Sequence, residues 1–123
     1  MKAKNWALLI GMTVLMGLAV LTFKPVPIPD EEDCLAVRGQ VTKIFEAGEK
    51  DVVFLLNGME EAFYVNRGLE RGLDIGNLRG ELMNKEIVIK YPKYWTPLDP
   101  RNAVRHVSKI EVEGETIFTE LRD

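Results

Sequence analysis

The chain has 123 residues, of which 16 are basic and 19 acidic, so its formal net charge is only −3. A charge this small excludes a molecule that recognises a strongly acidic or basic partner over its whole surface. The single cysteine, Cys34, excludes an intramolecular disulfide. Four acids directly precede Cys34, and because nearby acids raise the pKa of a thiol, we expect this cysteine to be inert.

The first strong signal is the uncharged segment "WALLIGMTVLMGLAVLTF", residues 6–23. As a helix that rises about 1.5 Å per residue it is roughly 27 Å long, close to a hydrocarbon core of about 30 Å. The alternative is a cleaved signal peptide, but that has a shorter apolar segment and a small-residue cleavage site, whereas the exit here reads "VLTFKPVP". We therefore expect residues 1–24 to be an uncleaved anchor that contacts the lipid bilayer through residues 6–23.

The charges beside this segment predict its orientation. Lys2 and Lys4 precede it, and Lys24 alone follows it before a run of acids. The positive-inside rule then places the N-terminus in the cytoplasm. The expected location is the bacterial inner membrane, with a single pass and a C-terminal domain that is periplasmic or extracellular.

Residues 25–34 are rich in proline and acids, which is typical of a semi-rigid polyproline II spacer. The acids lack the alternating oxygen ligands and the glycine of a calcium loop, so no metal site is predicted. From residue 35 to residue 123 we expect one folded domain.

Period-two patterns begin this domain. "LAVRGQVTKIF" has one apolar face, and Gly39 inside it predicts a bulge or a bend. "DVVFLLNG" is an apolar strand that ends in Asn-Gly, a dipeptide suited to a tight hairpin turn. "EEAFYVN" follows as a third strand, with Phe63 and Val65 on one face and Ala62 and Tyr64 on the other.

The period then changes to that of a short helix. Ile75, Leu78 and Leu82 fall at helical spacing, Asp74 is placed as the N-cap, and Asn84 as the stop. "KEIVIKY" is a fourth strand. Finally, "HVSKIEV" and "TIFTEL" predict a closing hairpin that turns at residues 113–115.

This order of elements resembles the oligonucleotide/oligosaccharide-binding (OB) fold over roughly residues 35–112. The resemblance implies a mainly β domain, a small OB-like five- to six-stranded Greek-key barrel with one short helix, preceded by the N-terminal transmembrane helix. The stretches "FYVNRGLERGL" and "KEIVIKYPKYWTPLDP" also resemble an uncharacterised family of small bacterial single-pass membrane proteins. That second resemblance implies an anchored location and brings no activity with it.

The richest candidate site is residues 91–106, "YPKYWTPLDPRNAVRH". In an OB-type barrel this would be the loop between the fourth and fifth strands, which flanks the usual ligand face. Aromatic rings can stack on bases or sugars, and cations can meet anionic groups. The candidate binding residues are Tyr91, Lys93, Tyr94, Trp95, Arg101, Arg105 and His106. The alternative is a proline-stiffened loop whose Tyr94 and Trp95 simply cover the mouth of the barrel.

Other functions have less support. Nucleic acid is an unlikely partner for a domain that faces away from the cytoplasm. The layout resembles that of the haem chaperone of cytochrome c maturation, but that family's tyrosine, four residues after its histidine, is replaced here by Ile110. Ser108 follows His106 by two residues without an identifiable third group. We therefore expect no catalytic residues, metal or cofactor.

The function expected from the sequence is a non-catalytic binding or accessory module of the envelope. It would contact a protein, a peptide or a saccharide through residues 91–106. The open alternatives are an envelope ligand carrier or small enzyme, which would need a pocket with convergent polar groups, and single-stranded nucleic-acid binding if the topology is reversed.

Overall fold

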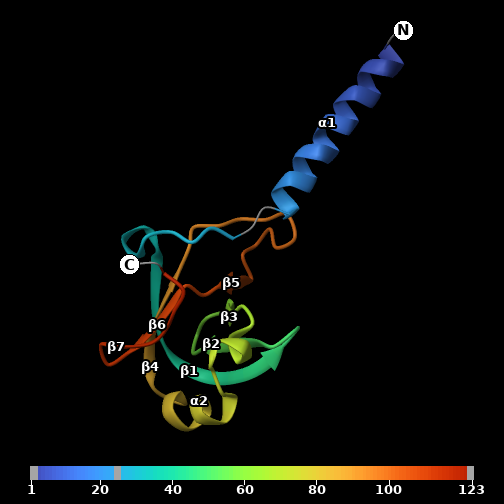
Figure 1. Ribbon diagram of the computed structural model, residues 1–123. Helices are drawn as coiled ribbons and strands as arrows, with labels where there is room; N and C mark the ends of the chain where they lie inside the picture. Colours follow the sequence, from blue (N-terminus) through green and yellow to red (C-terminus); the bar gives the residue numbers. More distant parts are fainter. Residues whose placement is uncertain (1–2, 24–25, 122–123) are drawn as a thin grey trace.

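The computed structural model describes residues 3–23 and 26–121 (Figure 1). Seven strands, two α-helices and two short 3₁₀ helices follow one another in these residues. In chain order they are α1 (Ala3–Phe23), η1 (Glu31–Asp33), β1 (Leu35–Ala47), β2 (Asp51–Leu56), β3 (Ala62–Val65), η2 (Gly68–Arg71), α2 (Ile75–Leu82), β4 (Glu86–Tyr91), β5 (Val104–His106), β6 (Lys109–Val112) and β7 (Glu115–Thr119). The prediction of a mainly β domain is confirmed.

Helix α1 stands apart from the β domain (Figure 1). It is long and apolar enough to span a membrane, and the apolar window runs over residues 5–22, none of which is buried against the rest of the chain. Lys2 and Lys24, on which the predicted orientation partly depends, lie outside the described residues.

Strand β1 is long because it serves two partners in succession. Its first half, Leu35 to Gln40, pairs with β4, and its second half, from Val41 onward, pairs with β2. The predicted bulge occurs between Val41 and Lys43 and not at Gly39. Gly39 has a different role: a Cβ there would lie 3.1 Å from the side chain of Leu56, so glycine allows this close approach.

The strands form one mixed sheet in the order β5-β3-β2-β1-β4-β6-β7, in which only β3 and β5 are parallel. The sheet is not closed, and β5 and β7 are its edges. It has more strands than predicted because the expected fifth strand is divided. The N–H of Val107 donates to the carbonyl of Tyr64 on β3, whereas the next N–H, of Ser108, donates to Lys90 on β4. The chain thus changes partner between β5 and β6.

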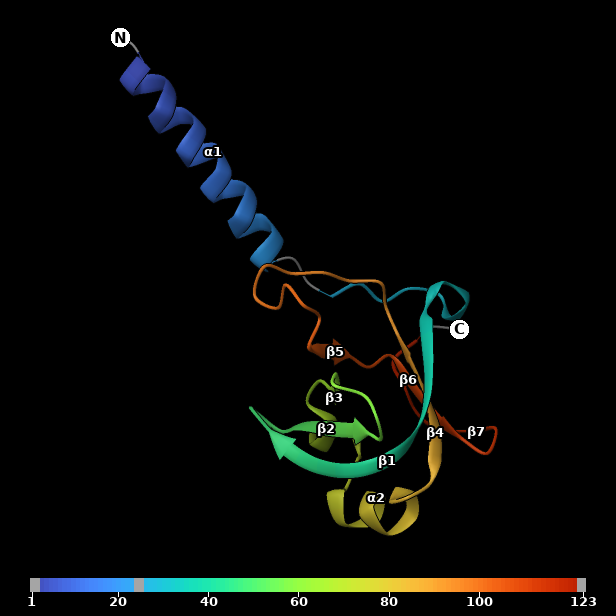
Figure 2. The same cartoon turned by 180° about the vertical axis from the view of Figure 1, so that it is seen from behind.

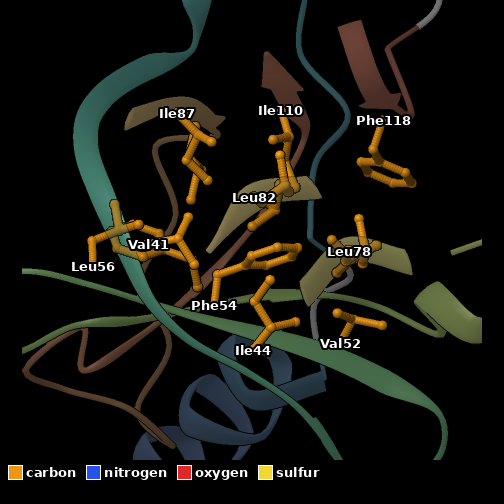
Figure 3. Packing of buried hydrophobic residues seen from close by; sticks show 14 residues of the cluster. Val41, Ile44, Val52, Phe54, Leu56, Leu78, Leu82, Ile87, Ile110 and Phe118 are labelled. Carbon is orange, nitrogen blue, oxygen red and sulfur yellow. The ribbon is translucent and has the colours of Figure 1, made fainter. Parts of the chain in front are cut away.

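Helix α2 closes the core, as its spacing predicted. Asp74 caps it by accepting a hydrogen bond from the N–H of Asn77 at 2.8 Å. Leu78 and Leu82 point from α2 into the same apolar space as Ile44 and Phe54 from the sheet (Figure 3). The two faces predicted for β3 are confirmed, since Phe63 and Val65 are fully buried while Ala62 and Tyr64 are only partly buried. On β4, Ile87 and Ile89 are fully buried as well.

The two predicted hairpins differ in form. The turn between β6 and β7 is tight, because Glu113 and Gly114 both have positive φ, as a type I′ turn requires. The connection between β2 and β3 is longer than the Asn-Gly dipeptide predicts. Of those two residues only Gly58 has positive φ, and the N–H of Asn57 is held by the carbonyl of Gln40 on β1.

The linker is docked on the domain. The carboxylate of Glu31 lies 2.5 Å from the Nζ of Lys90 and 2.7 Å from the Nζ of Lys109, and Glu111 lies against the same two lysines. The hydrogen bonds from Lys109 and Lys90 lower the pKa of Glu31 from 4.5 to about 2. The predicted spacer therefore ends in an ion-pair network that fixes η1 to β4 and β6.

Cys34 follows directly after η1. The pKa of its thiol is raised, as predicted, although burial and not the neighbouring acids is the main cause.

Candidate binding site

A pocket of about 450 Å³ lies between the β2–β3–β5 part of the sheet and the segment that connects β4 to β5. This volume falls within the range of small-ligand sites. The pocket is lined by Ala47, Asp51, Val53, Tyr64, Asn66, Pro92, Tyr94, Thr96, Asp99, Asn102, Val104, Arg105 and His106. Sheet and loop therefore supply opposite walls.

The register of three strands builds the floor. Val53 on β2 pairs with Tyr64 on β3, which pairs in turn with His106 on β5. Directly opposed residues share one face of a sheet, so these three side chains lie together. Their neighbours Val52 and Phe63 point to the other face and are fully buried in the core.

The loop wall is held by its own hydrogen bonds. Both carboxylate oxygens of Asp99 accept backbone N–H bonds, from Ala103 at 2.9 Å and from Val104 at 2.8 Å. The indole N–H of Trp95 donates to the carbonyl of Pro100 at 3.1 Å. These contacts fold the loop back on itself, so it presents a defined surface to the pocket.

His106 is fixed by a buried carboxylate. Its Nε2 lies 2.5 Å from Oε1 of Glu120, and the side chains of the two residues are 10% and 7% exposed. The other oxygen of Glu120 lies 3.3 Å from the guanidinium of Arg71. Because a carboxylate oxygen accepts, Nε2 donates, and the buried Nδ1 of His106 is left without a partner.

Tyr64 lies at the centre of the floor. The ring of Tyr64 and the imidazole of His106 are in edge-to-face contact, with a centroid distance of 5.4 Å and an interplanar angle of 85°. The pKa of Tyr64 is raised, mainly by burial and to a smaller extent by the nearby carboxylate of Asp51. The phenol therefore stays protonated at neutral pH and is able to donate a hydrogen bond.

The structure divides the seven predicted site residues into separate groups. Tyr94, Arg105 and His106 line the pocket. Lys93, Trp95 and Arg101 are exposed and are not among the residues that line it.

Arg105 also contacts the remaining predicted residue, Tyr91 at the end of β4. The guanidinium of Arg105 lies 5.0 Å above the ring of Tyr91, which packs in turn on the core residue Phe63 at 6.0 Å. Arg105 pairs with Phe63, and consecutive strand residues point to opposite faces. The side chain of Arg105 therefore belongs to the core side, although the residue borders the pocket.

Several polar residues of the site were not predicted. Asp51 begins β2 and accepts the N–H of Arg67 at 2.8 Å. Asn66 belongs to "NRGLERGL", a glycine-arginine stretch that has neither the spacing of a P-loop nor that of a dinucleotide-binding loop. Glu120 follows the last strand, and no local pattern marks it.

The arrangement is suited to binding more than to catalysis. Ser108 is fully buried, and the partner of His106 is Glu120, so the two residues do not form a nucleophile–base pair. The Nε2 of His106 is also occupied by Glu120, which does not suit a free haem ligand. What the pocket offers is a set of fixed hydrogen-bonding groups beside two tyrosines.

Comparison with known proteins adds no further assignment. No protein-family model matches the chain, and no curated protein matches it significantly. The function is therefore argued from the pocket and the anchor.

Proposed function

We propose that this chain is a single-pass bacterial membrane protein whose OB-like domain is a non-catalytic binding module of the envelope. Its pocket takes a saccharide or a peptide segment of an envelope partner. The observation that carries the proposal is a pocket of about 450 Å³ whose floor holds Tyr64 beside the nine-tenths buried His106, which Glu120 orients. Fixed polar side chains in the lining, such as those of Tyr64, Asn66 and Asn102, can exchange hydrogen bonds with such a ligand.

Two features support an OB-like arrangement. Residues 104–112 form a continuous segment that hydrogen-bonds to β3 at one end and to β4 at the other, so the chain itself links the two sides of the sheet. The pocket lies on strands β2 and β3 beside the β4–β5 connection, which is where an OB fold places its ligand.

The lining favours an uncharged polar ligand over a phosphate chain. Tyr64, Asn66 and Asn102 offer hydrogen bonds, and the lining has two carboxylates, Asp51 and Asp99, against one guanidinium, that of Arg105. Single-stranded nucleic acid needs a cationic track beside exposed rings. The exposed cations of the loop, Lys93 and Arg101, lie outside the pocket lining.

The proposed orientation rests on Lys2 and Lys4 at the N-terminal end of the span. It is tested with paired reporters fused after Asp123, one active only in the cytoplasm and one only outside it. Activity of the external reporter is the expected result. Activity of the cytoplasmic reporter would reverse the orientation and make a cytosolic ligand the better candidate.

The binding site is tested by photocrosslinking in intact cells. A benzophenone amino acid is placed at Thr96, which lines the pocket, and in a matched variant at Thr116, an exposed threonine of β7. We expect a discrete adduct from position 96 alone, and its sensitivity to protease or to glycosidase would identify its class. Equal adducts at both positions, or none at position 96, would contradict the proposed site.

A further inference from the structure

The exposed apolar side chains of the β domain are concentrated in one region. Outside α1, the large hydrophobic residues that the structure describes as exposed are Ile28, Leu35, Trp95, Leu98 and Val104. They belong to the linker, to the β4–β5 loop or to the strand residues beside these segments, and none of those described comes from α2, β6 or β7. Trp95 is 47% and Leu98 75% exposed.

This region is the end of the domain that faces the anchor. The linker and the loop that follows β4 run side by side there, and the loop approaches the C-terminal end of α1, while α2 lies at the opposite end (Figures 1 and 2). The tether is short. Phe23 ends α1 and Glu31 is fixed to β4 and β6, so the seven residues between them, or eight Cα–Cα steps, span at most about 28 Å even when fully extended. The docked end of the linker therefore stays within this distance of the end of the anchor.

The chemistry of the loop fits a bilayer surface. The indole N–H of Trp95 is already bonded to Pro100, yet much of its ring is exposed, which is the amphipathic form that tryptophan takes at a headgroup layer. Lys93 and Arg101 flank the exposed apolar residues and are themselves exposed, so their charged ends can reach phosphates while their stems lie on apolar surface.

We propose that residues 93–101, which we call the interfacial loop, insert Trp95 and Leu98 into the headgroup region of the membrane beside α1. The inference rests on the proposed membrane anchor and adds a second contact with the lipid. The contact is limited to this loop, because the exposed acids Asp30, Glu32 and Asp33 lie together around η1, farther from α1 (Figures 1 and 2). Acids are repelled by anionic lipids.

The contact places the binding pocket directly at the membrane. Within the loop, Tyr94, Thr96 and Asp99 line the pocket, while the intervening Trp95 and Leu98 are exposed. One side of the loop is thus a pocket wall and the other side rests on lipid, so the bilayer would stabilise the wall.

The test uses the full chain in lipid nanodiscs. The chain contains two tryptophans, so Trp6→Phe leaves Trp95 as the only one. Lipids brominated near the headgroup end of the acyl chain are expected to quench Trp95 at least twofold more than lipids brominated near the chain end, and its emission shifts to the blue relative to water. Leu98→Asp, an exposed change, is expected to halve this quenching or more.

Two controls separate the possible failures. In a variant with Trp6→Phe, Trp95→Phe and Thr116→Trp, the tryptophan on β7 should not be quenched. In Trp95→Phe, the remaining Trp6 reports on the anchor. If Trp6 is quenched and Trp95 is not, the proposed lipid contact of the interfacial loop is contradicted, while the proposed membrane anchor is supported. If neither is quenched, the anchor and this inference both fail.

Discussion

The Nε2 of His106 lies 2.5 Å from the carboxylate of Glu120, which joins the last residue of β5 to the residue that follows β7. The same carboxylate contacts Arg71, which ends η2. The backbone N–H of Glu120 donates to the carbonyl of Ser108. One side chain therefore connects three parts of the chain beneath the pocket. The bond to His106 matters most, because the buried imidazole would lose its acceptor where little water reaches it, whereas the side chain of Arg71 is 41% exposed.

The first prediction concerns this carboxylate. Glu120→Ala should lower the free energy of unfolding by about 2–3 kcal/mol, since it leaves the buried imidazole without its acceptor. The measurement is chemical denaturation of the detergent-solubilised chain, followed by near-ultraviolet circular dichroism. Glu115→Ala, an exposed change on β7, is the control and should stay within about 0.5 kcal/mol of the wild type. Equal effects of the two substitutions would show that the bond to His106 contributes little.

Replacing each of two glycines by alanine should change the stability of the domain in opposite directions. A Cβ on Gly68 would lie 2.8 Å from Cγ2 of Val52, a fully buried core residue, so Gly68→Ala should destabilise the domain by about 1–3 kcal/mol through overpacking. A Cβ on Gly80 meets nothing within 4 Å, and this residue lies inside α2. Gly80→Ala should therefore stabilise by about 0.5–1 kcal/mol. Thermal unfolding of both variants under one condition tests the pair, and a shift of both in the same direction would contradict it.

Local features of the sequence predicted much of this fold. The helix α2 was found from the spacing of its leucines and from Asp74, because caps and periodicity act within a few residues. The sequence did not predict that the expected fifth strand is divided into β5 and β6. It depends on Val107 and Ser108 bonding to different strands, and hydrogen-bond partners that are distant in sequence leave no mark on the local pattern.

The candidate site was predicted only in part, for the same reason. The aromatic and basic composition of residues 91–106 drew attention to the loop, and three of the predicted residues, Tyr94, Arg105 and His106, line the pocket. Composition does not give register, however, so the packing of Arg105 on Tyr91 was not anticipated. Glu120 was missed because its contact with His106 forms only when β7 pairs with β6 and brings the residue after β7 back to the end of β5.

The docking of the linker should depend on pH. The pKa of Glu31 is lowered to about 2 in the folded chain, from an ordinary value of 4.5, by the hydrogen bonds from Lys109 and Lys90. A group whose pKa is depressed by folding contributes stability above its ordinary pKa, and that contribution is lost as the pH falls through the folded value. Between about pH 5 and pH 2, η1 should therefore detach from β4 and β6.

Amide chemical shifts of residues 31–34, followed by NMR during an acid titration, measure this detachment. Glu31→Gln should place these shifts near their low-pH positions already at neutral pH. Glu32→Gln is the matched control, because Glu32 is exposed and makes no ion pair with the described residues. Identical titrations of the two variants would mean that Glu31 does not fix the linker.

The last prediction concerns the carboxylate that shapes the pocket wall. Asp99 accepts hydrogen bonds from the N–H groups of Ala103 and Val104 at the start of β5, and both of its oxygens are used. Asp99→Ala removes both acceptors, and Asp99→Asn keeps only one oxygen. Hydrogen exchange at these two amides should therefore accelerate by about tenfold or more in the alanine variant, since the loss of about 1.4 kcal/mol or more of local stability corresponds to that factor. The asparagine variant should lie between alanine and the wild type.

Amides of α2 and β4 provide the internal reference for this experiment, because neither element contacts Asp99 through these bonds. Their exchange should stay unchanged if Asp99 acts on the loop alone. Photocrosslinking from position 96 should decrease in parallel with the loss of protection, since Thr96 and Asp99 are joined by a β-bridge across the loop. Unchanged crosslinking in a chain whose amides exchange faster would show that the partner binds the sheet floor around Tyr64 and does not need an ordered loop wall.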